Sequence, residues 1–202
     1  MFIEEGGLTA LIDPGSYNPE PKMTGIDVIL ITHDHDDHCY LPQITSIMER
    51  NPQAEIITIP AVGKKLESAG LKWTRIKDGE EIERKGVKIA SYGTKHARIH
   101  PEMPIFDNTG FLIGGRLFFP GDALFVPPVA VEILALPAAA PWMRVEESIE
   151  YARAVKPKIA FPVHDGIMKP EARGFAKMLA AQFIVPSGIE FRDATEGTEL
   201  TF

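Results

Sequence analysis

The amino-acid sequence predicts a mixed α/β protein in which two β-sheets pack against each other and helices cover the outside. Apolar runs of strand length come first in hairpins and later alternate with segments of helical periodicity, and this order indicates that architecture. The chain has 202 residues, of which 45% are hydrophobic. This length suits one domain with a large hydrophobic core and is short for two domains with separate cores. We therefore expect one domain that spans residues 1–202.

The first half of the chain begins with a predicted hairpin. Residues 2–3 and 8–12 are apolar runs separated by Glu-Glu-Gly-Gly, and Asp13-Pro14-Gly15 ends the second run. Residues 15–23 are rich in Pro, Asn, Ser and Gly, which is typical of a surface loop. The other elements expected here are a buried strand at 28–31, a helix from 41 to 51, a strand at 55–59, a helix at 62–69 ending at Gly70, and half-exposed antiparallel strands at 73–76, 80–82 and 87–92.

The second half alternates strands and helices. Gly114-Gly115 separates apolar runs at 111–113 and 117–119, which is a hairpin pattern. A buried strand is expected at 129–136, where Pro137 halts it. The elements expected after it are a helix at 146–155, a strand at 158–163, a helix starting near Pro170 with the apolar stripe Phe175, Met178, Leu179 and Phe183, and a short strand pair after Gly188.

Composition and charge exclude several functions. The formal net charge is −7 and the sequence contains no block of Lys and Arg, so a bulk nucleic-acid binder or an anionic-membrane binder is disfavoured. No apolar run approaches the roughly 20 residues that span a bilayer, and the N-terminus lacks a secretory pattern. Cys39 is the single cysteine, so no intramolecular disulfide can form. We expect a cytoplasmic protein with a small-molecule substrate, and a homo-oligomer stays open.

The densest chemical feature is the stretch Thr-His-Asp-His-Asp-Asp-His at residues 32–38. It follows a β-branched apolar run, so it is expected to be a loop at the end of a buried strand. Imidazole and carboxylate groups together suit zinc, iron, manganese or nickel. The competing interpretation is a solvated acidic loop that happens to contain histidines.

Three other apolar runs end in the same way. His96 follows the run at 87–92, Asp122 follows the run at 117–119, and His164 directly follows the run at 158–163. Side chains gathered at the ends of several strands can form one site that no single segment could build. The residues expected to converge are His33, His35, Asp37, His38, His96, Asp122 and His164.

These motifs resemble, in their order along the chain, the metallo-β-lactamase superfamily of metal-dependent hydrolases. The motif His33-x-His35-x-Asp37-His38 is followed by His96, by Gly121-Asp122 and by His164. Asp13 resembles the family's first motif, an aspartate that supports the metal loop from outside the ligand set. The segments at 96–101 and 119–122 are similar to those of the small lactonase-like branch related to ascorbate-6-phosphate lactonase. The resemblance covers nearly the whole chain and implies a four-layer αββα sandwich, with a difference at the edge of the first sheet, where relatives usually have a further strand.

The resemblance also implies two divalent metal ions, zinc first, with manganese, iron or nickel as alternatives. One ion would be held by His33, His35 and His96, and the other by Asp37, His38 and His164, with Asp122 between them. A metal-bridged hydroxide would then attack an ester, lactone or phosphoester of a small polar substrate. Asp37 could also orient the water or accept its proton.

Other residues near the predicted site have weaker claims. His100 could donate a proton to the leaving group or bind an anion, or be a loop histidine packed on Pro101. Trp142 could line the substrate pocket, although anchoring a loop to the core is the commoner role of a tryptophan. Cys39 is expected to be a small buried thiol rather than a competitor for metal. Lys95 and Arg98 could contact an anionic substrate, with exposure to solvent as the default.

Three other functions compete with this hydrolase. A phosphodiesterase or nuclease of the same fold would need an inserted domain or RNA-binding arm, for which 202 residues leave no room. A redox di-iron protein is disfavoured because such relatives have a glutamate where this chain has His35. A metal-binding module without catalysis is also disfavoured, since all the candidate ligands are present.

Overall fold

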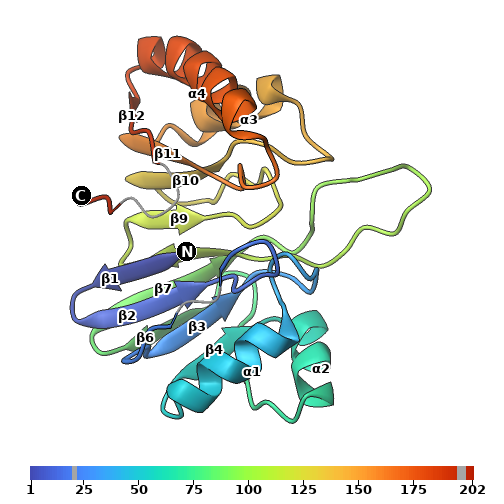
Figure 1. The fold of residues 1–202 in the computed structure, drawn as a ribbon. Helices are drawn as coiled ribbons and strands as arrows, with labels where there is room; N and C mark the ends of the chain where they lie inside the picture. Colours follow the sequence, from blue (N-terminus) through green and yellow to red (C-terminus); the bar gives the residue numbers. More distant parts are fainter. Residues whose placement is uncertain (20–21, 195–198) are drawn as a thin grey trace.

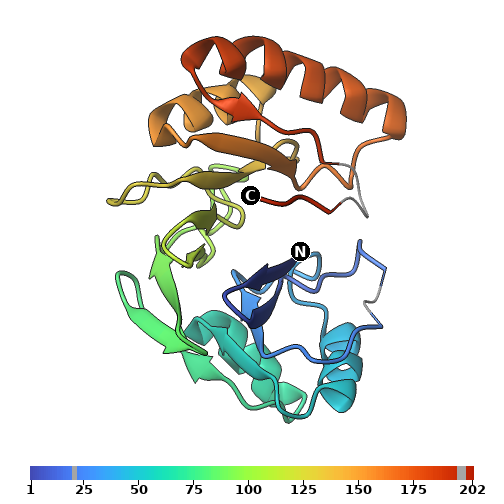
Figure 2. The same cartoon turned by 90° about the vertical axis from the view of Figure 1, so that its left-hand side faces the viewer.

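The computed structural model describes residues 1–19, 22–194 and 199–202. Among these residues the strands form two mixed sheets, one of five strands in the order β1-β2-β3-β4-β5 and one of seven in the order β12-β11-β10-β9-β8-β7-β6. The helices lie outside them, with α1 and α2 at one end of the stack in Figure 1 and α3 and α4 at the other. Figure 2 shows the same succession of layers from a second direction. This arrangement is the predicted αββα sandwich.

The five-stranded sheet belongs to the first part of the chain. Its strands are β1 (Phe2–Glu5), β2 (Leu8–Ile12), β3 (Val28–Ile31), β4 (Glu55–Thr58) and β5 (Thr74–Arg75), covered by α1 (Leu41–Arg50) and α2 (Pro60–Ser68). The predicted hairpin is confirmed, since β1 and β2 are antiparallel. The later strands β3, β4 and β5 add in parallel. The strand β1 is the edge of this sheet, where the resemblance implied a difference.

The seven-stranded sheet contains the rest. Its strands are β6 (Glu81–Arg84), β7 (Val87–Tyr92), β8 (Gly110–Ile113), β9 (Leu117–Phe119), β10 (Ile133–Pro137), β11 (Ile159–Val163) and β12 (Glu190–Phe191), with α3 (Val145–Val155) and α4 (Pro170–Ile184) outside and a 3-10 turn, Val185–Ser187, after α4. Strands β6 to β9 are antiparallel, and β9 to β12 are parallel. The predicted hairpin around Gly114-Gly115 is confirmed, and both glycines have positive φ.

Three apolar layers hold the stack together, because successive residues of a strand point to opposite faces. In β3, Val28 and Leu30 face the second sheet and join Ile89 and Phe111 in the central layer. The neighbouring Ile29 and Ile31 face outward and pack on α1 and α2. On the far side the second sheet packs on α3 and α4. Burial on both faces explains why β3 reads as an unbroken apolar run.

Several predicted elements were wrong in detail. The segment at 73–76 forms β5, which is parallel to β4 instead of antiparallel. The strand expected at 129–136 begins only at Ile133 and includes Pro137, which pairs with Val163. The tail after Gly188 supplies β12, which pairs with β11 instead of forming a strand pair of its own, and residues 195–198 lie outside the described residues. The loop expected at 15–23 also includes residues 20–21, which lie outside the described residues.

The apolar stripe predicted for α4 was wrong at three of its four residues, since only Leu179 is half-buried. Phe175 and Met178 are 60% and 52% exposed, and Phe183 is 42% exposed. The buried side of the helix is formed by Ala176, Ala180 and Ile184. The helix therefore packs on its side with small residues and leaves the larger apolar side chains exposed. Among the described residues, no helix has both the length and the apolar character needed to cross a membrane.

Candidate metal centre

The loop at residues 32–38 follows β3 directly and places its side chains at the carboxyl-terminal end of that strand. His33 and His38 are buried, while His35 and Asp37 are partly exposed. The His33 ring lies 4.7 Å from the His35 ring and 4.1 Å from the His38 ring, measured between centroids. Three imidazoles are therefore held within contact distance by one short loop.

His96 comes from the end of β7 and joins His33 and His35. One ligand nitrogen from each of these three histidines lies within 4.8 Å of the other two. The backbone fixes this approach, because the His96 N–H donates to Phe106 O at 3.0 Å and the Ala97 N–H donates to Asp122 O at 2.8 Å. The His96 Nδ1 lies 2.6 Å from Ala97 O, and a carbonyl can only accept, so Nδ1 carries the hydrogen and Nε2 has the free lone pair.

A second group joins the first through Asp122. Asp37, His38 and His164 bring one ligand atom each within 4.8 Å, and so do His33, His38 and Asp122. The Nε2 atoms of His38 and His164 lie 3.2 Å apart. The His164 Nδ1 donates to Ala139 O at 2.6 Å, which aims its Nε2 inward. His164 has a φ of 61°, a left-handed conformation that is unusual for a residue with a side chain.

All seven residues that the sequence suggested for the metal site are brought together by the structure, from the ends of β3, β7, β9 and β11. The three groups above show that these side chains lie close together. Their role as metal ligands stays a prediction. His100 is different, since it is exposed and its Nδ1 accepts a hydrogen bond from the Glu102 N–H at 3.2 Å. It belongs to none of the three groups found among the described residues.

Asp13 supports the loop at residues 32–38 from outside the group of candidate ligands. Its Oδ1 accepts a hydrogen bond from the Thr32 N–H at 2.8 Å, and its Oδ2 lies 2.7 Å from both Thr32 Oγ1 and His38 Nδ1. Asp13 is buried and has a φ of 48°, also left-handed. One carboxylate thus fixes the first residue of the loop and the ring of its last histidine.

Three buried atoms test whether a cation fits here. Among the described residues, His33 Nε2, His96 Nε2 and Asp122 Oδ1 are buried without a hydrogen-bond partner. Asp122 Oδ1 lies 3.1 Å from His38 Nε2 and 3.3 Å from His164 Nε2, but neither contact has the geometry of a hydrogen bond. Each buried polar atom without a partner costs about 1–3 kcal/mol. A divalent cation would be a partner for all three, so the residues present fit a metal.

The protonation states also suit ligands. Burial, reinforced by the neighbouring His38, holds the pKa of His33 well below its usual value, so this imidazole is neutral. Burial also lowers the pKa of His35. Although Asp122 is buried, the nearby rings of His164, His38 and His96 lower its pKa and keep it ionised.

His38 behaves differently from the other histidines of the loop. Burial opposes its charged form, but the carboxylates of Asp13 and Asp122 outweigh burial and raise its pKa to about 10. A cation that binds at His38 Nε2 would replace a proton there, as metal binding to a protonated ligand requires.

Three residues that support this group were missed by sequence reasoning. The Phe106 ring packs 4.6 Å from the His35 ring. Lys65 on α2 donates to Asp34 O at 2.6 Å and to Asp36 Oδ1 at 2.7 Å, which ties the loop to the helix. A Cβ on Gly15 would lie 1.6 Å from Asp37 O, so only glycine fits there. These contacts are made between distant parts of the chain and leave no local pattern in the sequence.

For Trp142 the sequence suggested a loop anchor or a pocket wall, and the structure adds a polar partner that the sequence did not indicate. Its Nε1 donates to Asp122 Oδ2 at 3.0 Å. Of the remaining residues, Cys39 is buried in the apolar layer under α1, and burial raises its pKa to about 12, which fits the predicted buried thiol. Lys95 pairs with Asp107 at 2.7 Å, and Arg98 is exposed.

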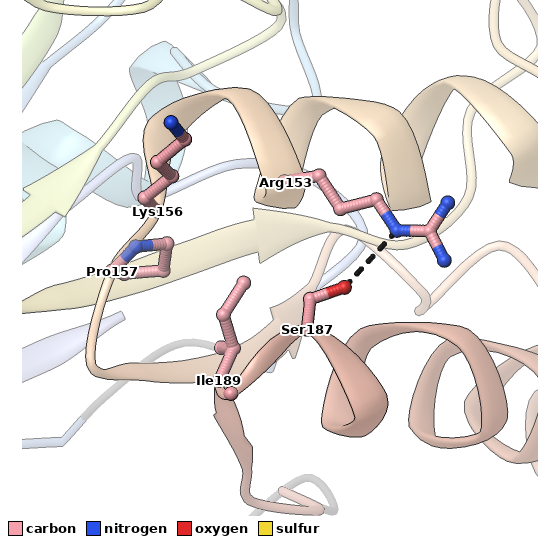
Figure 3. A pocket seen from close by; sticks show the side chains of 6 residues that line it. Arg153, Lys156, Pro157, Ser187 and Ile189 are labelled. Carbon is pink, nitrogen blue, oxygen red and sulfur yellow. Dashed lines mark hydrogen bonds between the residues drawn. The ribbon is translucent and has the colours of Figure 1, made fainter.

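A surface pocket of about 380 Å³ lies elsewhere, between α3 and the 3-10 turn (Figure 3), and it contains none of the seven residues. Its lining residues are Arg153, Lys156, Pro157, Ser187, Gly188 and Ile189. The Arg153 Nε donates to Ser187 Oγ at 3.2 Å, and its other two nitrogens donate to Glu150 Oε1 and Phe183 O. The guanidinium is therefore occupied in packing α3 against the end of α4.

A four-layer sandwich with His and Asp side chains at its strand ends defines a class of metalloproteins, and comparison with known proteins gives the family. The model of the β-lactamase superfamily domain matches residues 1–164. The chain belongs to this superfamily, as its motifs suggested.

Relatives and solved structures agree with this family. Protein Rv0786c of Mycobacterium tuberculosis is 40% identical over 180 residues, which cover 86% of this chain and 84% of that protein. A UPF0173 metal-dependent hydrolase, Ta0764 of Thermoplasma acidophilum, is 27% identical over 169 residues, which cover 76% of this chain and 74% of that protein. In fold, the chain is similar to Igni18, a metallo hydrolase from Ignicoccus hospitalis, with a TM-score of 0.76, 21% identity, and coverage of 100% of this chain and 93% of that one. It is also similar to an isothiocyanate hydrolase from Delia radicum gut bacteria, with a TM-score of 0.69, 15% identity, and coverage of 100% and 95%.

Proposed function

We propose that this protein is a metal-dependent hydrolase that cleaves an ester, lactone or phosphoester of a small polar substrate. Membership of the β-lactamase superfamily and a relative named a metal-dependent hydrolase support the general class. The observation that carries the proposal is that three buried atoms without a hydrogen-bond partner, His33 Nε2, His96 Nε2 and Asp122 Oδ1, belong to residues that lie together in the groups of candidate ligands.

The proposed ligand sets follow the groups described above. His33, His35 and His96 would hold one divalent ion, while Asp37, His38 and His164 would hold another, with Asp122 shared between them. Zinc suits these nitrogen and oxygen ligands, as do manganese, iron and nickel. When bound, two such ions lower the pKa of water towards neutrality and polarise the oxygen of the bond to be cleaved.

The chain's own residues would complete the reaction. Asp122 Oδ1 faces His38 and His164, and its Oδ2 lies 3.5 Å from His96 Nε2, so the carboxylate spans both groups. Asp37 Oδ2 lies 3.8 Å from both His38 Nε2 and His164 Nε2. Because Asp37 is partly exposed, it can meet incoming water, orient it and accept its proton. His100, on the exposed loop after His96, would donate a proton to the leaving group.

Several wider statements belong to the same proposal. We take residues 1–202 as one domain, because buried residues of both sheets share one apolar layer. We also propose that the protein is cytoplasmic. The proposed partner is a small molecule, and neither nucleic acid nor a membrane is proposed as a partner. The formal net charge of −7 supports the exclusion of nucleic acid and anionic membranes, but an anionic small substrate is compatible with it because bound cations supply local positive charge.

Elemental analysis of protein purified without added metal tests this function. We expect about two transition-metal ions per chain, with a lower content in Asp122→Ala. The control is Asp107→Ala, which removes an exposed carboxylate that pairs only with Lys95 in the contacts described above. Less than one ion per chain in the wild type, unaffected by Asp122→Ala, would contradict the dinuclear site.

A panel of lactones, carboxyl esters and phosphodiesters tests the reaction itself. The loaded wild type is expected to hydrolyse members of at least one class. Stoichiometric metal without hydrolysis of any class would favour a metal-binding module, and salt-dependent binding to RNA would favour a nuclease. An iron-loaded, coloured protein would favour redox chemistry.

A further inference from the structure

We infer that Trp142 is a positioning residue for Asp122, and that the loop at residues 138–144 braces two sides of the proposed metal centre at once. This inference rests on the proposed function, because it concerns how the chain holds a carboxylate that would be shared between two ions. The loop connects β10 to α3 and contributes none of the seven candidate ligands. Its contribution is to hold two of them from outside.

The first brace is the indole of Trp142. Its Nε1 donates to Asp122 Oδ2 at 3.0 Å, and its ring lies 5.7 Å from the His96 ring. A carboxylate attached by one single bond can rotate, and a donor on one oxygen fixes where the other points. With Oδ2 held by Trp142, Oδ1 points to His38 Nε2 and His164 Nε2 at 3.1 and 3.3 Å. The indole therefore selects the orientation in which Asp122 faces both groups.

The second brace is a carbonyl of the same loop. Ala139 O accepts the hydrogen of His164 Nδ1 at 2.6 Å, which leaves Nε2 as the inward-facing nitrogen. The loop is itself fixed at its start, because the Ala138 N–H donates to Val163 O at 2.9 Å. It is also fixed at its end, where the Arg144 N–H donates to Glu147 Oε2 at 2.7 Å in the first turn of α3. A short loop tied at both ends can hold Asp122 and His164 in a fixed mutual geometry.

The hydrogen bond matters because of its surroundings. Asp122 is only 3% exposed, so water cannot replace a lost donor easily, and hydrogen bonds to buried charged groups are among the stronger ones. Partners that orient a metal-binding side chain from outside typically change metal affinity about 10-fold to 100-fold when they are removed. We expect an effect of this size from Trp142→Phe, which keeps an aromatic ring but removes the N–H.

The chain contains a matched control. It has two tryptophans, and the other one, Trp73, also donates its Nε1 to a carboxylate, Glu67 Oε1, at the same distance of 3.0 Å. Trp73 packs against Gly63 of α2, its hydrogen bond to Glu67 is exposed, and none of the contacts described above joins it to a candidate ligand. The substitution Trp73→Phe thus removes the same kind of hydrogen bond without touching the site.

Binding of Co²⁺ to metal-free protein tests the inference. Affinity is measured by competition with a chelator, and the coordination of the ion by its visible absorption. We expect Trp142→Phe to bind Co²⁺ at least about tenfold more weakly than the wild type and to shift the absorption bands, because Asp122 turns. Trp73→Phe is expected to change neither quantity, and thermal unfolding of the metal-free variants reports on their folding.

Emission from Trp142 gives a second reading in a protein that keeps this residue. In Trp73→Phe, Trp142 is the remaining tryptophan, and addition of Zn²⁺ is expected to change its emission saturably because a cation is placed beside its acceptor, the Asp122 carboxylate. Asp122→Asn in the same background is expected to abolish the response. This measurement holds even if Trp142→Phe does not fold.

The outcomes separate this inference from the proposed function. If the wild type binds Co²⁺ and Asp122→Ala weakens the binding, but Trp142→Phe has wild-type affinity and absorption, the positioning role is wrong while the site stands. Equal weakening in Trp142→Phe and Trp73→Phe, in proportion to lost stability, also overturns it. If the wild type binds no Co²⁺, the proposed function fails first.

Discussion

The two sheets contribute to the site in opposite ways. The first sheet provides a single loop, residues 32–38, that contains four of the seven candidate ligands. The second sheet provides three isolated residues, His96, Asp122 and His164, each from the end of a different strand. The dense loop is recognisable in the sequence by itself. The isolated residues acquire meaning only through the topology that brings β7, β9 and β11 to the same end of the stack.

The difference extends to how each contribution is supported. The dense loop is held from outside by Asp13, by Gly15 and by Lys65 of α2. The isolated residues are held mainly by backbone groups and by the loop at 138–144. We therefore expect substitutions around the dense loop to affect folding and chemistry together, and the following predictions test this expectation.

The largest effect is expected on hydrolysis. Asp37→Asn keeps the shape and an oxygen ligand but removes the proposed proton acceptor, so the rate should fall about 10²-fold to 10⁴-fold with metal still bound. The rate at saturating metal, together with metal content, measures this. Asp34→Asn is the control, since it makes the same change in the same loop at a residue outside the three ligand groups. Equal loss of rate in both variants would show that loop charge, and not Asp37 itself, is responsible.

The next largest effect is expected on stability. In Gly15→Ala the new Cβ would meet Asp37 O at 1.6 Å and Asp37 C at 2.0 Å, and backbone atoms cannot move aside as a side-chain end can. We expect a loss of about 3 kcal/mol or more in the free energy of unfolding, measured by urea denaturation, together with lower metal content. The control is Gly174→Ala in α4, where the Cβ meets nothing within 4 Å and a gain of about 0.5–1 kcal/mol is expected. A wild-type stability for Gly15→Ala would mean that the support of the dense loop is not rigid.

A somewhat smaller loss is expected from Asp13→Asn. The amide has one acceptor where the carboxylate serves Thr32 N, Thr32 Oγ1 and His38 Nδ1, so at least one buried donor is left facing an NH₂ group. The expected cost is about 2 kcal/mol in the unfolding of metal-free protein. Asp27→Asn provides the comparison, because Asp27 also accepts a backbone N–H but pairs with Lys85 near the surface. If both variants lose the same free energy, burial of Asp13 is not what matters.

The smallest effect concerns an ion pair that joins the two sheets. Arg84 of β6 donates to both oxygens of Glu55 on β4, at 2.5 and 2.8 Å. This hydrogen-bonded contact lowers the pKa of Glu55, against the opposing effect of partial burial. Its stabilisation is therefore present above the ordinary Glu value of 4.5 and is lost as the pH falls through the lower folded-state pKa.

We expect Glu55→Gln to destabilise the protein by about 0.5–1 kcal/mol at neutral pH, since partly exposed pairs contribute little. The difference from the wild type should vanish in acid, and urea denaturation at several pH values measures it. Glu81→Gln is the control within one sheet, where it loses the exposed contact with Lys88. A difference that persists unchanged in acid would show that Glu55 acts through packing.

Much of the fold was predictable because local patterns decide it. The strand β3 was found at its exact bounds from its β-branched run, and both hairpins were found from their glycine pairs. The errors arose where tertiary contacts decide. The strand β5 is parallel to β4 because the chain between them returns through α2 on the outside of the sheet. The alternation of apolar and polar residues in so short a strand does not indicate whether it pairs in parallel or antiparallel.

The helix α4 shows the same limit. Its sequence contains two possible apolar faces. The face with Ala176 and Ala180 is buried against the rest of the protein, while Phe175 and Met178 are exposed. Periodicity identifies a helix but does not say which of two apolar faces the rest of the protein can accommodate.

For the site, the sequence identified the residues that carry donor atoms and one supporting residue, Asp13, but it missed the other contacts that hold the donor residues in place. His, Asp and their spacing form a chemical pattern, whereas Phe106, Lys65 and Trp142 are ordinary residues whose roles come from packing across the chain. For Trp142 the sequence favoured the anchoring of a loop to the core. The structure adds a hydrogen bond from its indole N–H to Asp122, a residue of the candidate site.

The left-handed backbone at Asp13 and His164 affects which substitutions stabilise the protein at these positions. A residue with a Cβ in that conformation costs about 1–2 kcal/mol, which glycine at the same position would avoid. At Asp13 the three contacts of the buried carboxylate offset this cost, whereas at His164 the chain gives up stability to keep a functional side chain. A library selected only for heat resistance should accumulate glycine or asparagine at position 164, whereas one selected for hydrolysis should retain histidine there and gain its stability elsewhere.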